Sequence, residues 1–346
     1  MGTFPGSSPS AFEAPRTLRL SVFSTMNESV GGDGPVHVPV LAEEILRLLG
    51  GGRGASSPQG LVVDATLGAG GHSALLLERF PRLRLLGVDQ DPEILTIARE
   101  RLEPFTDRAR IEHARMSELD GILGTLDEAP VAMLMDLGAS SLQLDRPERG
   151  FSFSWDGPLD MRMDPRRQRT AADIVNRWDE GDLADLFYHE GGERGARRVA
   201  RAIVDSRRRA PFRRTRALSE IVALSLGRPI RSRSGEGTRR GAIHPATRVF
   251  QALRRAVNEE AEELDAGLAA ARRHLAPDGL LLAVSFHSGE DGVVKRFLAE
   301  GARTGEWDLL TRRPVEASAE EVRSNPRARS AKLRSARRRL AQGGEA

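Results

Sequence analysis

The chain has no cysteine among its 346 residues, which excludes a disulfide scaffold, a thiolate zinc site and a cysteine nucleophile. It also lacks long apolar runs: the stretch from Gly279 to Phe286 is among the longest, whereas a membrane-spanning helix needs ~20 residues. The first 25 residues show no charged start followed by an apolar stretch and a small-residue cleavage site, so we do not expect them to be a secretory signal. We therefore expect a cytoplasmic protein with no membrane partner.

Lysine is nearly absent, because Lys295 and Lys332 are the only two and arginine supplies the other 50 of the 52 basic residues. A GC-rich genome would account for much of this bias. The distribution is more informative, since residues 196–216 contain nine arginines and one acid, Asp205, and residues 323–339 are similarly basic. Local clusters of this kind can follow phosphates.

Short apolar runs alternate with helical patterns in a chain whose length predicts two domains, or one large domain with an insertion. Strands are predicted at 61–64, 85–89, 131–136 and 280–286, and helices at 73–80, 92–101 and, as one long helix, 247–275. This order predicts an α/β fold with a parallel, doubly wound sheet. After Asp136 the alternation stops for about 110 residues that show only helical patterns.

We accordingly expect three regions. Residues 1–35, rich in Gly, Ser and Pro, form a disordered N-terminal extension. Residues 36–141 and 245–340 form the sheet domain, and residues 142–244 form a helical insertion domain.

A glycine-rich turn follows the first predicted strand, with Gly68, Gly70 and Gly71 directly before a helix. Glycines there let the backbone approach a ligand at the carboxyl edge of a sheet, although a plain strand-to-helix turn would also use them. Asp89 ends the second strand, 21 residues after Gly68, where a carboxylate can bind ribose hydroxyls. The spacing differs from the G-x-G-x-x-G of dinucleotide enzymes, and the additional acids Asp64 and Asp136 suit S-adenosylmethionine, which carries an amino group and a sulfonium.

Six blocks along the chain then resemble one family. They begin at Asp136 (DLGASSLQLD), Arg149 (RGFSF), Gly157 (GPLDMRMD), His244 (HPATRVFQALR), Ser285 (SFHSGED) and Asn325 (NPRARSAKLR). Together they resemble the RsmH (MraW) family of bacterial small-subunit (16S) ribosomal RNA cytosine-N4-methyltransferases, over about residues 37–337. The resemblance implies a class I (Rossmann-like) methyltransferase fold with a helical insertion.

The resemblance also implies a set of S-adenosylmethionine ligands. These are Gly70, Gly71, His72, Asp89, Met116, Asp136 and Gln143. Met116 replaces an aromatic residue expected there, which exchanges stacking for a softer apolar contact with the adenine. The chain also departs from the family at Leu142, usually proline, and at Gly289 and Gly292, usually leucine and arginine.

The cytosine amine is a poor nucleophile, so positioning and electrostatics must dominate catalysis. Asp136 is placed to bind the methionine amino group, the role we favour, or to accept the N4 proton; a helix N-cap is the structural alternative. We expect Asp136, Ser140 and His287 to be catalytic, with Asp160 and Arg162 contributing to the base pocket, although His287 would equally suit a purely structural contact. No metal site is expected, and the pair Asp160 and Asp164 is predicted to lie in a solvated turn.

The family makes 16S ribosomal RNA within the small ribosomal subunit the expected partner, contacted by the insertion. The candidate phosphate contacts are Arg197, Arg198, Arg201, Arg207, Arg208, Arg209, Arg213, Arg214 and Arg216, with Arg327, Arg329, Lys332 and Arg334 in the tail. Solvated helix faces are the alternative for both sets. The competing functions are a methyltransferase for another substrate, a nicotinamide oxidoreductase and an inactive RNA-binding assembly factor. The sequence leaves the oligomeric state open, a dimer included.

Overall fold

A computed structural model of the chain describes residues 39–51, 57–138, 140–227 and 244–339. The expected N-terminal extension, residues 1–35, lies outside the described residues.

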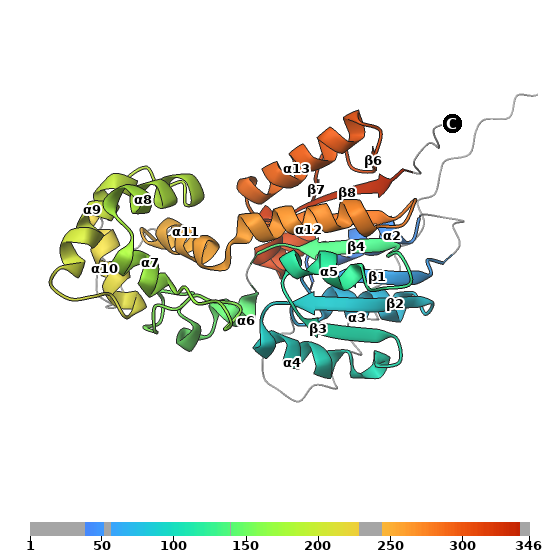
Figure 1. The fold of residues 1–346 in the computed structure, drawn as a ribbon, viewed down its shortest axis with the longest axis horizontal. Helices are drawn as coiled ribbons and strands as arrows, with labels where there is room; N and C mark the ends of the chain where they lie inside the picture. Colours follow the sequence, from blue (N-terminus) through green and yellow to red (C-terminus); the bar gives the residue numbers. More distant parts are fainter. Residues whose placement is uncertain (1–38, 52–56, 139, 228–243, 340–346) are drawn as a thin grey trace, which may run out of the picture. The chain divides into compact units, whose positions relative to one another are not determined.

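The described strands form one eight-stranded sheet in the order β3-β2-β1-β4-β5-β8-β6, with β7 paired to β8 (Figure 1). Strands β3, β2, β1, β4 and β5 are parallel, and β8 runs antiparallel to both β5 and β6. This is the strand order of class I methyltransferases, so the predicted doubly wound sheet is confirmed. The strands are β1 (Gly60–Asp64), β2 (Leu83–Asp89), β3 (Ala109–His113), β4 (Ala132–Asp136), β5 (Leu280–Ser285), β6 (Trp307–Leu309), β7 (Val315–Glu316) and β8 (Lys332–Arg338).

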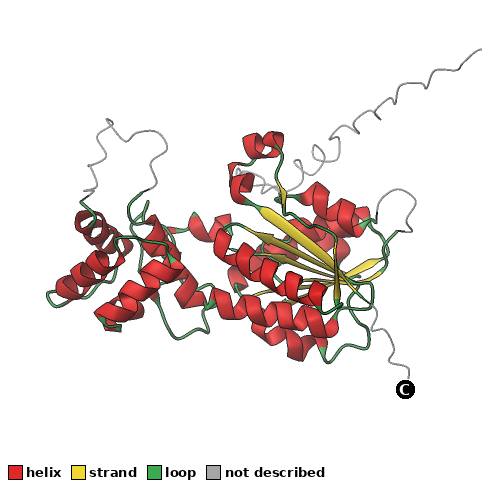
Figure 2. Ribbon diagram, turned by 90° about the horizontal axis from the view of Figure 1, so that it is seen from above, coloured by secondary structure: helices red, strands yellow, loops and turns green. Residues whose placement is uncertain are grey.

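Helices cover both faces of the sheet, because alternate side chains of each strand point to opposite sides (Figure 2). In β1, Val62 packs with α2, α3 and α4, while Val63 packs on the other face with α5, α12 and α13. The helices of the first face are α2 (Ala42–Leu49), α3 (Gly71–Arg79) and α4 (Pro92–Arg101), and those of the second are α5 (Leu119–Leu123), α12 (Glu260–His274) and α13 (Ser288–Arg303). Short helices fill the connections: η1 (Glu103–Phe105), η2 (Met116–Glu118), α14 (Ala319–Ser324) and η5 (Pro326–Ser330).

The segment between β4 and β5 has its own hydrophobic core, running from Phe151 to Val257. Its described part contributes no strand to the sheet. Its elements are α6 (Ser141–Leu144), η3 (Pro147–Arg149), α7 (Ala171–Arg177), α8 (Glu180–Asp185), the π-helical turn η4 (Leu186–Glu190), α9 (Ala196–Arg207), α10 (Thr215–Ser225) and α11 (Thr247–Asn258). Because α11 packs into this core, we propose that the insertion continues to Asn258.

The prediction of a single helix over 247–275 is wrong. The helix is interrupted at Glu259, which takes a left-handed conformation with φ 51° between α11 and α12. The fully buried Asn258 fixes this break. Its amide donates to the Met161 carbonyl at 2.8 Å, and its Oδ1 accepts the Met163 amide at 2.8 Å. The break therefore joins the insertion to the helix that covers the sheet.

The basic tail forms β8, a strand that sequence patterns did not predict, in the interior of the sheet. Arg334 is buried and makes two hydrogen bonds with Asp291, at 2.7 and 3.1 Å. Its guanidinium therefore pairs within the fold, which removes Arg334 from the candidate phosphate contacts. Lys332 lies 3.9 Å from the same carboxylate.

None of the helices in the described residues is both long enough and apolar enough to cross a membrane.

Candidate cofactor and methyl-transfer site

The turn between β1 and α3 brings the predicted glycines to the carboxyl edge of the sheet. Gly68 and Gly70 have φ of +52° and +76°, in the left-handed region that favours glycine. Gly71 is crowded instead, because a β-carbon there would lie 2.8 Å from Cγ of Pro39. Gly70 is the N-cap of α3, so the free amides of that helix begin at this edge.

Asp89 meets this turn from the end of β2, as predicted. Its Oδ2 accepts the Gly68 amide at 2.8 Å and its Oδ1 accepts the Asp91 amide at 2.9 Å. Burial raises the pKa of Asp89 to about 6, while these backbone bonds favour the charged form. The carboxylate thus fixes the turn at the carboxyl edge of the sheet.

Asp136 ends the neighbouring strand β4 and has one oxygen without a partner. Its amide donates to Oγ1 of Thr66 at 2.6 Å, which ties it to the glycine turn. Its Oδ2 lies 3.6 Å from Nδ1 of His72, whereas its Oδ1 is covered and has no hydrogen-bond partner among the described residues. Burial, followed by the negative charge of Glu290, raises the pKa of Asp136 to about 7. An orphaned polar oxygen at this place fits a donor group from a ligand.

Met116 and Gln143 have contacts of different kinds. Met116 opens η2, is half-buried, and lies against α12, where a β-carbon on Gly267 would be 3.1 Å from its sulfur. The buried amide of Gln143 accepts the Ser140 amide at 3.0 Å and donates to Oδ2 of Asp91 at 2.8 Å. Gln143 therefore holds the segment that carries Ser140, a role that its place in a family block did not reveal.

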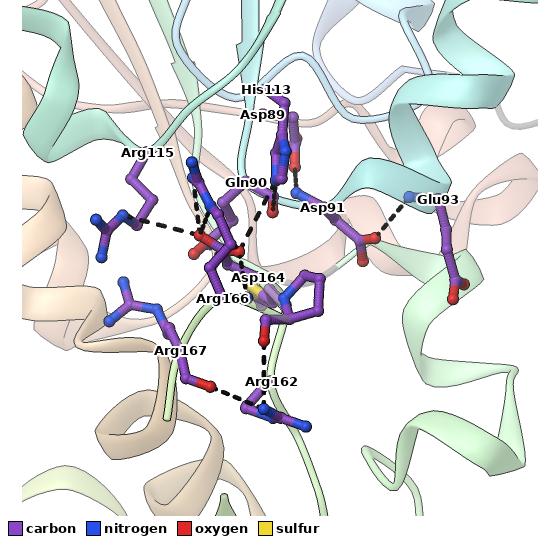
Figure 3. A network of polar contacts seen from close by, with 12 residues as sticks. Asp89, Gln90, Asp91, Glu93, His113, Arg115, Arg162, Asp164, Arg166 and Arg167 are labelled. Atoms are coloured by element: carbon purple, nitrogen blue, oxygen red, sulfur yellow. Dashed lines mark hydrogen bonds and ion pairs between the residues drawn. The ribbon is translucent and has the colours of Figure 1, made fainter. Parts of the chain in front are cut away.

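A polar network that the sequence did not predict joins β2 to the insertion (Figure 3). Asp91, fully buried, accepts Nη2 of Arg149 at 2.9 Å. Nε2 of His113 donates to the Gln90 carbonyl at 3.0 Å and lies 3.8 Å from Oδ1 of Asp164. Arg149 could have been singled out from the sequence, because it lies in one of the six family blocks. No sequence spacing identified Asp91 as its partner, however.

The predicted solvated turn at Asp160 and Asp164 is wrong for Asp164, which is fully buried. Although burial favours the neutral acid, hydrogen bonds from Arg166 hold the pKa of Asp164 below its usual value. Asp160 is half-buried and bonds Arg162 through both oxygens at 2.8 Å. Among the described residues, no hydrogen bond or ion pair joins Asp160 or Arg162 to His287.

His287 instead meets two glutamates. Its Nδ1 accepts the amides of Gly289 and Glu290 at 3.2 and 3.3 Å, as the N-cap of α13. The proton of a neutral ring is then on Nε2, which lies 3.0 Å from Oε1 of Glu290 without an aligned hydrogen bond. Glu260 completes a group whose ligand-type atoms lie within 4.8 Å, but both its oxygens bind Arg254, at 2.7 and 2.9 Å. The proton on Nε2 of His287 and the positive guanidinium of Arg254 both disfavour a metal cation at this group.

The arginines of the insertion divide into those that pair with the described residues and those that do not. Arg201, Arg208 and Arg214 form ion pairs with Glu180, Asp205 and Asp156, and Arg207 donates to the Val175 carbonyl. Arg197 and Arg198 have no ion pair with the described residues; they line a cleft of about 970 Å³ at the start of α9. The cleft is lined by residues of α8, η4, α9 and α11, among them Tyr188 and Arg248, and by Glu193 and Arg194 between η4 and α9. Tyr188 is 57% exposed, so this cleft offers both charge and an aromatic ring.

Residues 35–339 match the model of the MraW methylase family. The chain belongs to this family. It is 47% identical over 317 residues to "Ribosomal RNA small subunit methyltransferase H" of Bradyrhizobium diazoefficiens, covering 87% of this chain and 91% of that protein. A protein of the same name from Synechococcus sp. (strain WH7803) is 48% identical over 305 residues, covering 88% and 95% of the two chains. The resemblance seen in the six sequence blocks is thereby confirmed.

Among solved structures, the N-methyltransferase NodS from Bradyrhizobium japonicum WM9, in complex with S-adenosyl-l-homocysteine, is 10% identical. The alignment covers 92% of this chain and 98% of that chain, with a TM-score of 0.37. The order of the strands in the sheet, and not this likeness, identifies the fold.

Proposed function

We propose that this chain transfers a methyl group from S-adenosylmethionine to N4 of a specific cytidine in the decoding region of 16S ribosomal RNA. The observation that carries the proposal is the orphaned Oδ1 of Asp136, which lies at the sheet edge beside the glycine turn in a chain of the MraW methylase family. The relatives' name supports the small ribosomal subunit as the source of the substrate.

The residues at the edge of the sheet fit the parts of this cofactor. Asp89 would accept hydrogen bonds from the ribose, Gly70 and the first amides of α3 would approach the methionine end, and Met116 would contact the adenine. When bound, S-adenosylmethionine supplies a methyl group on a positively charged sulfonium. Asp136 would face the cationic end of the cofactor or the amine of the base.

Catalysis would rest on orientation and on acceptance of positive charge. The lone pair of the cytosine amine is delocalised into the ring, so the enzyme must align the amine and accept its proton as the N–C bond forms. Ser140 and His287 are the further candidates. The covered Nε2–H of His287 has no aligned acceptor within the described residues and would suit an acceptor atom of the base.

The cleft at the start of α9 would hold the ribosomal RNA. Arg194, Arg197 and Arg198 would neutralise phosphates, and the exposed ring of Tyr188 would stack on an unpaired base. A cytoplasmic location stays a prediction, and the oligomeric state stays open.

The test is methyl transfer from labelled S-adenosylmethionine to isolated small subunits that lack the modification, compared with mixtures of metabolites. Digestion of the RNA and mass spectrometry of its nucleosides should reveal N4-methylcytidine at one position. Label in metabolites alone, or on another base, would contradict the proposal. Thermal stabilisation by NAD and not by S-adenosylmethionine would favour an oxidoreductase.

A further inference from the structure

The protonation state of His72 follows from its neighbours. Its Nε2 lies 2.9 Å from the carbonyl oxygen of Val40. A carbonyl can only accept, so Nε2 carries the proton and the Nδ1 of the neutral ring is bare. That bare nitrogen is the atom that lies 3.6 Å from Oδ2 of Asp136. A lone pair and a carboxylate oxygen repel each other, whereas one proton between them would bind both.

Three acids from different elements face the buried His72 ring. Asp136 comes from β4, Asp64 from β1 and Glu321 from α14. Asp64 is held by Oγ of Ser73 at 2.6 Å, and Glu321 accepts the amide of the residue after Val40 at 2.7 Å. Burial lowers the pKa of His72, and the two carboxylates Asp64 and Glu321 oppose that effect. The ring is therefore neutral at rest, in surroundings that can hold a transient positive charge.

The two oxygens of Asp136 thus face different partners. Oδ2 faces the bare nitrogen of His72, and Oδ1 is covered and unpartnered among the described residues. Two further acids act on Asp136: the negative charge of Glu290 of α13 favours a proton on this carboxyl group, and the Asp64 carboxyl group interacts with it electrostatically. A carboxyl group with a proton on Oδ2 would donate to His72 and leave Oδ1 as a bare acceptor.

We propose that His72 is a positioning residue for methyl transfer, which takes a proton from Oδ2 of Asp136 as Oδ1 takes the proton of the cytosine amine. The inference rests on the proposed function and adds to it a route for the proton. It selects the proton-accepting role of Asp136 over binding of the cofactor's amino group.

The proton exchange balances. The N4–H bond breaks as an O–H bond forms at Oδ1, and the Oδ2–H bond breaks as an N–H bond forms at Nδ1 of His72. No group is oxidised or reduced, and the carboxyl group stays neutral. The positive charge ends on the imidazolium, with its Nε2–H still bonded to Val40.

The first test needs neither substrate nor cofactor. Nitrogen-15 NMR of the free, histidine-labelled protein should show His72 with a protonated Nε2 and a bare Nδ1 at pH 8. Its Nδ1 signal should shift as Asp136 takes up a proton on acidification, and this shift should be absent in Asp136→Asn. A proton on Nδ1 at pH 8, or an Nδ1 signal that shifts in the same way in wild type and Asp136→Asn, would overturn the proposal.

The second test is the pH profile of single-turnover methylation in wild type and His72→Gln. The glutamine amide keeps a donor for Val40 but has no titrating nitrogen, so a structural role alone would be preserved. In the variant, we expect the methylation rate to fall on acidification with a midpoint near pH 7, the pKa of Asp136. Its rate should be about tenfold lower at pH 6 than at pH 8. The wild-type midpoint should lie at lower pH.

His274→Gln is the matched control, because His274 pairs with Asp120 at the end of α12. It should retain the wild-type profile. An unchanged midpoint and rate in His72→Gln would refute the proton route while leaving the function intact. Failure of the wild type to bind S-adenosylmethionine or to methylate small subunits would refute the proposed function instead, and the NMR result would still stand.

Discussion

Arg149 of the insertion and Asp91 of the sheet domain form an ion pair with Nη2 2.9 Å from Oδ2. The Asp91 side chain is fully buried, and that of Arg149 is 13% exposed. Removing the arginine would leave a carboxylate without its charge partner in the interior. We expect Arg149→Met to lower the free energy of unfolding by about 3 kcal/mol, as measured by urea denaturation.

The matched control for this pair is Arg84→Met. Arg84 is 58% exposed in its pair with Glu128, so the loss should stay below about 1 kcal/mol. Equal losses in both variants would show that burial does not determine the strength of the Arg149 pair.

Gly70 should tolerate no side chain. Alanine at φ +76° would be strained, and its β-carbon would lie 3.4 Å from Leu102. We expect Gly70→Ala to cost about 1 to 2 kcal/mol of stability and to weaken S-adenosylmethionine binding in calorimetry. Gly121→Ala, in α5 where a β-carbon meets nothing within 4 Å, should not lower the stability and should leave the cofactor affinity unchanged. Cofactor affinity equal to wild type in Gly70→Ala would remove the turn from the binding site.

Asp89 should make stability depend on pH. Its pKa is raised from 3.8 to about 6 by burial, so the folded state binds the proton more tightly than the unfolded state. This contribution is therefore present at low pH and is lost as pH rises from about 4 to 6. Relative to wild type, Asp89→Asn should gain in melting temperature between pH 4 and pH 7. A constant difference across this range would contradict the raised pKa.

The same substitution should weaken S-adenosylmethionine binding at pH 8 by at least about tenfold, because the amide lacks the second acceptor oxygen for a ribose. Calorimetry at pH 8 measures this loss. Unchanged affinity would exclude Asp89 as a cofactor ligand.

The sequence predicted the centre of the sheet because buried parallel strands are continuous apolar runs. Residues 131–136 and 280–286 are such runs, and they form β4 and β5. Strand β3 was missed because Ala109–His113 is only partly buried and mostly polar. Strand β8 was interpreted as a basic RNA-binding tail, since nothing local shows that Asp291 neutralises Arg334.

The cofactor edge was predictable for a similar reason. Glycines that need positive φ and a carboxylate that ends a strand are local features, and the structure brings Gly68 and Asp89 within 2.8 Å. The break at Glu259 was not predictable, because it depends on contacts between Asn258 and backbone groups 95 and 97 residues away. The tautomer of His72 likewise depends on Val40, 32 residues earlier.

Arg197 and Arg198, which line the cleft and form no ion pair with the described residues, should determine how binding to the small subunit depends on salt. Each phosphate contact releases counterions, so replacing Arg197 and Arg198 with glutamine should reduce the slope of log affinity against log salt by about 1.5 to 2. The slope is measured by filter binding at several salt concentrations. Arg84→Gln, an exposed arginine of β2, should leave it unchanged. If the double variant keeps the wild-type slope, the RNA does not contact the start of α9, because loss of two phosphate contacts cannot leave counterion release unaltered.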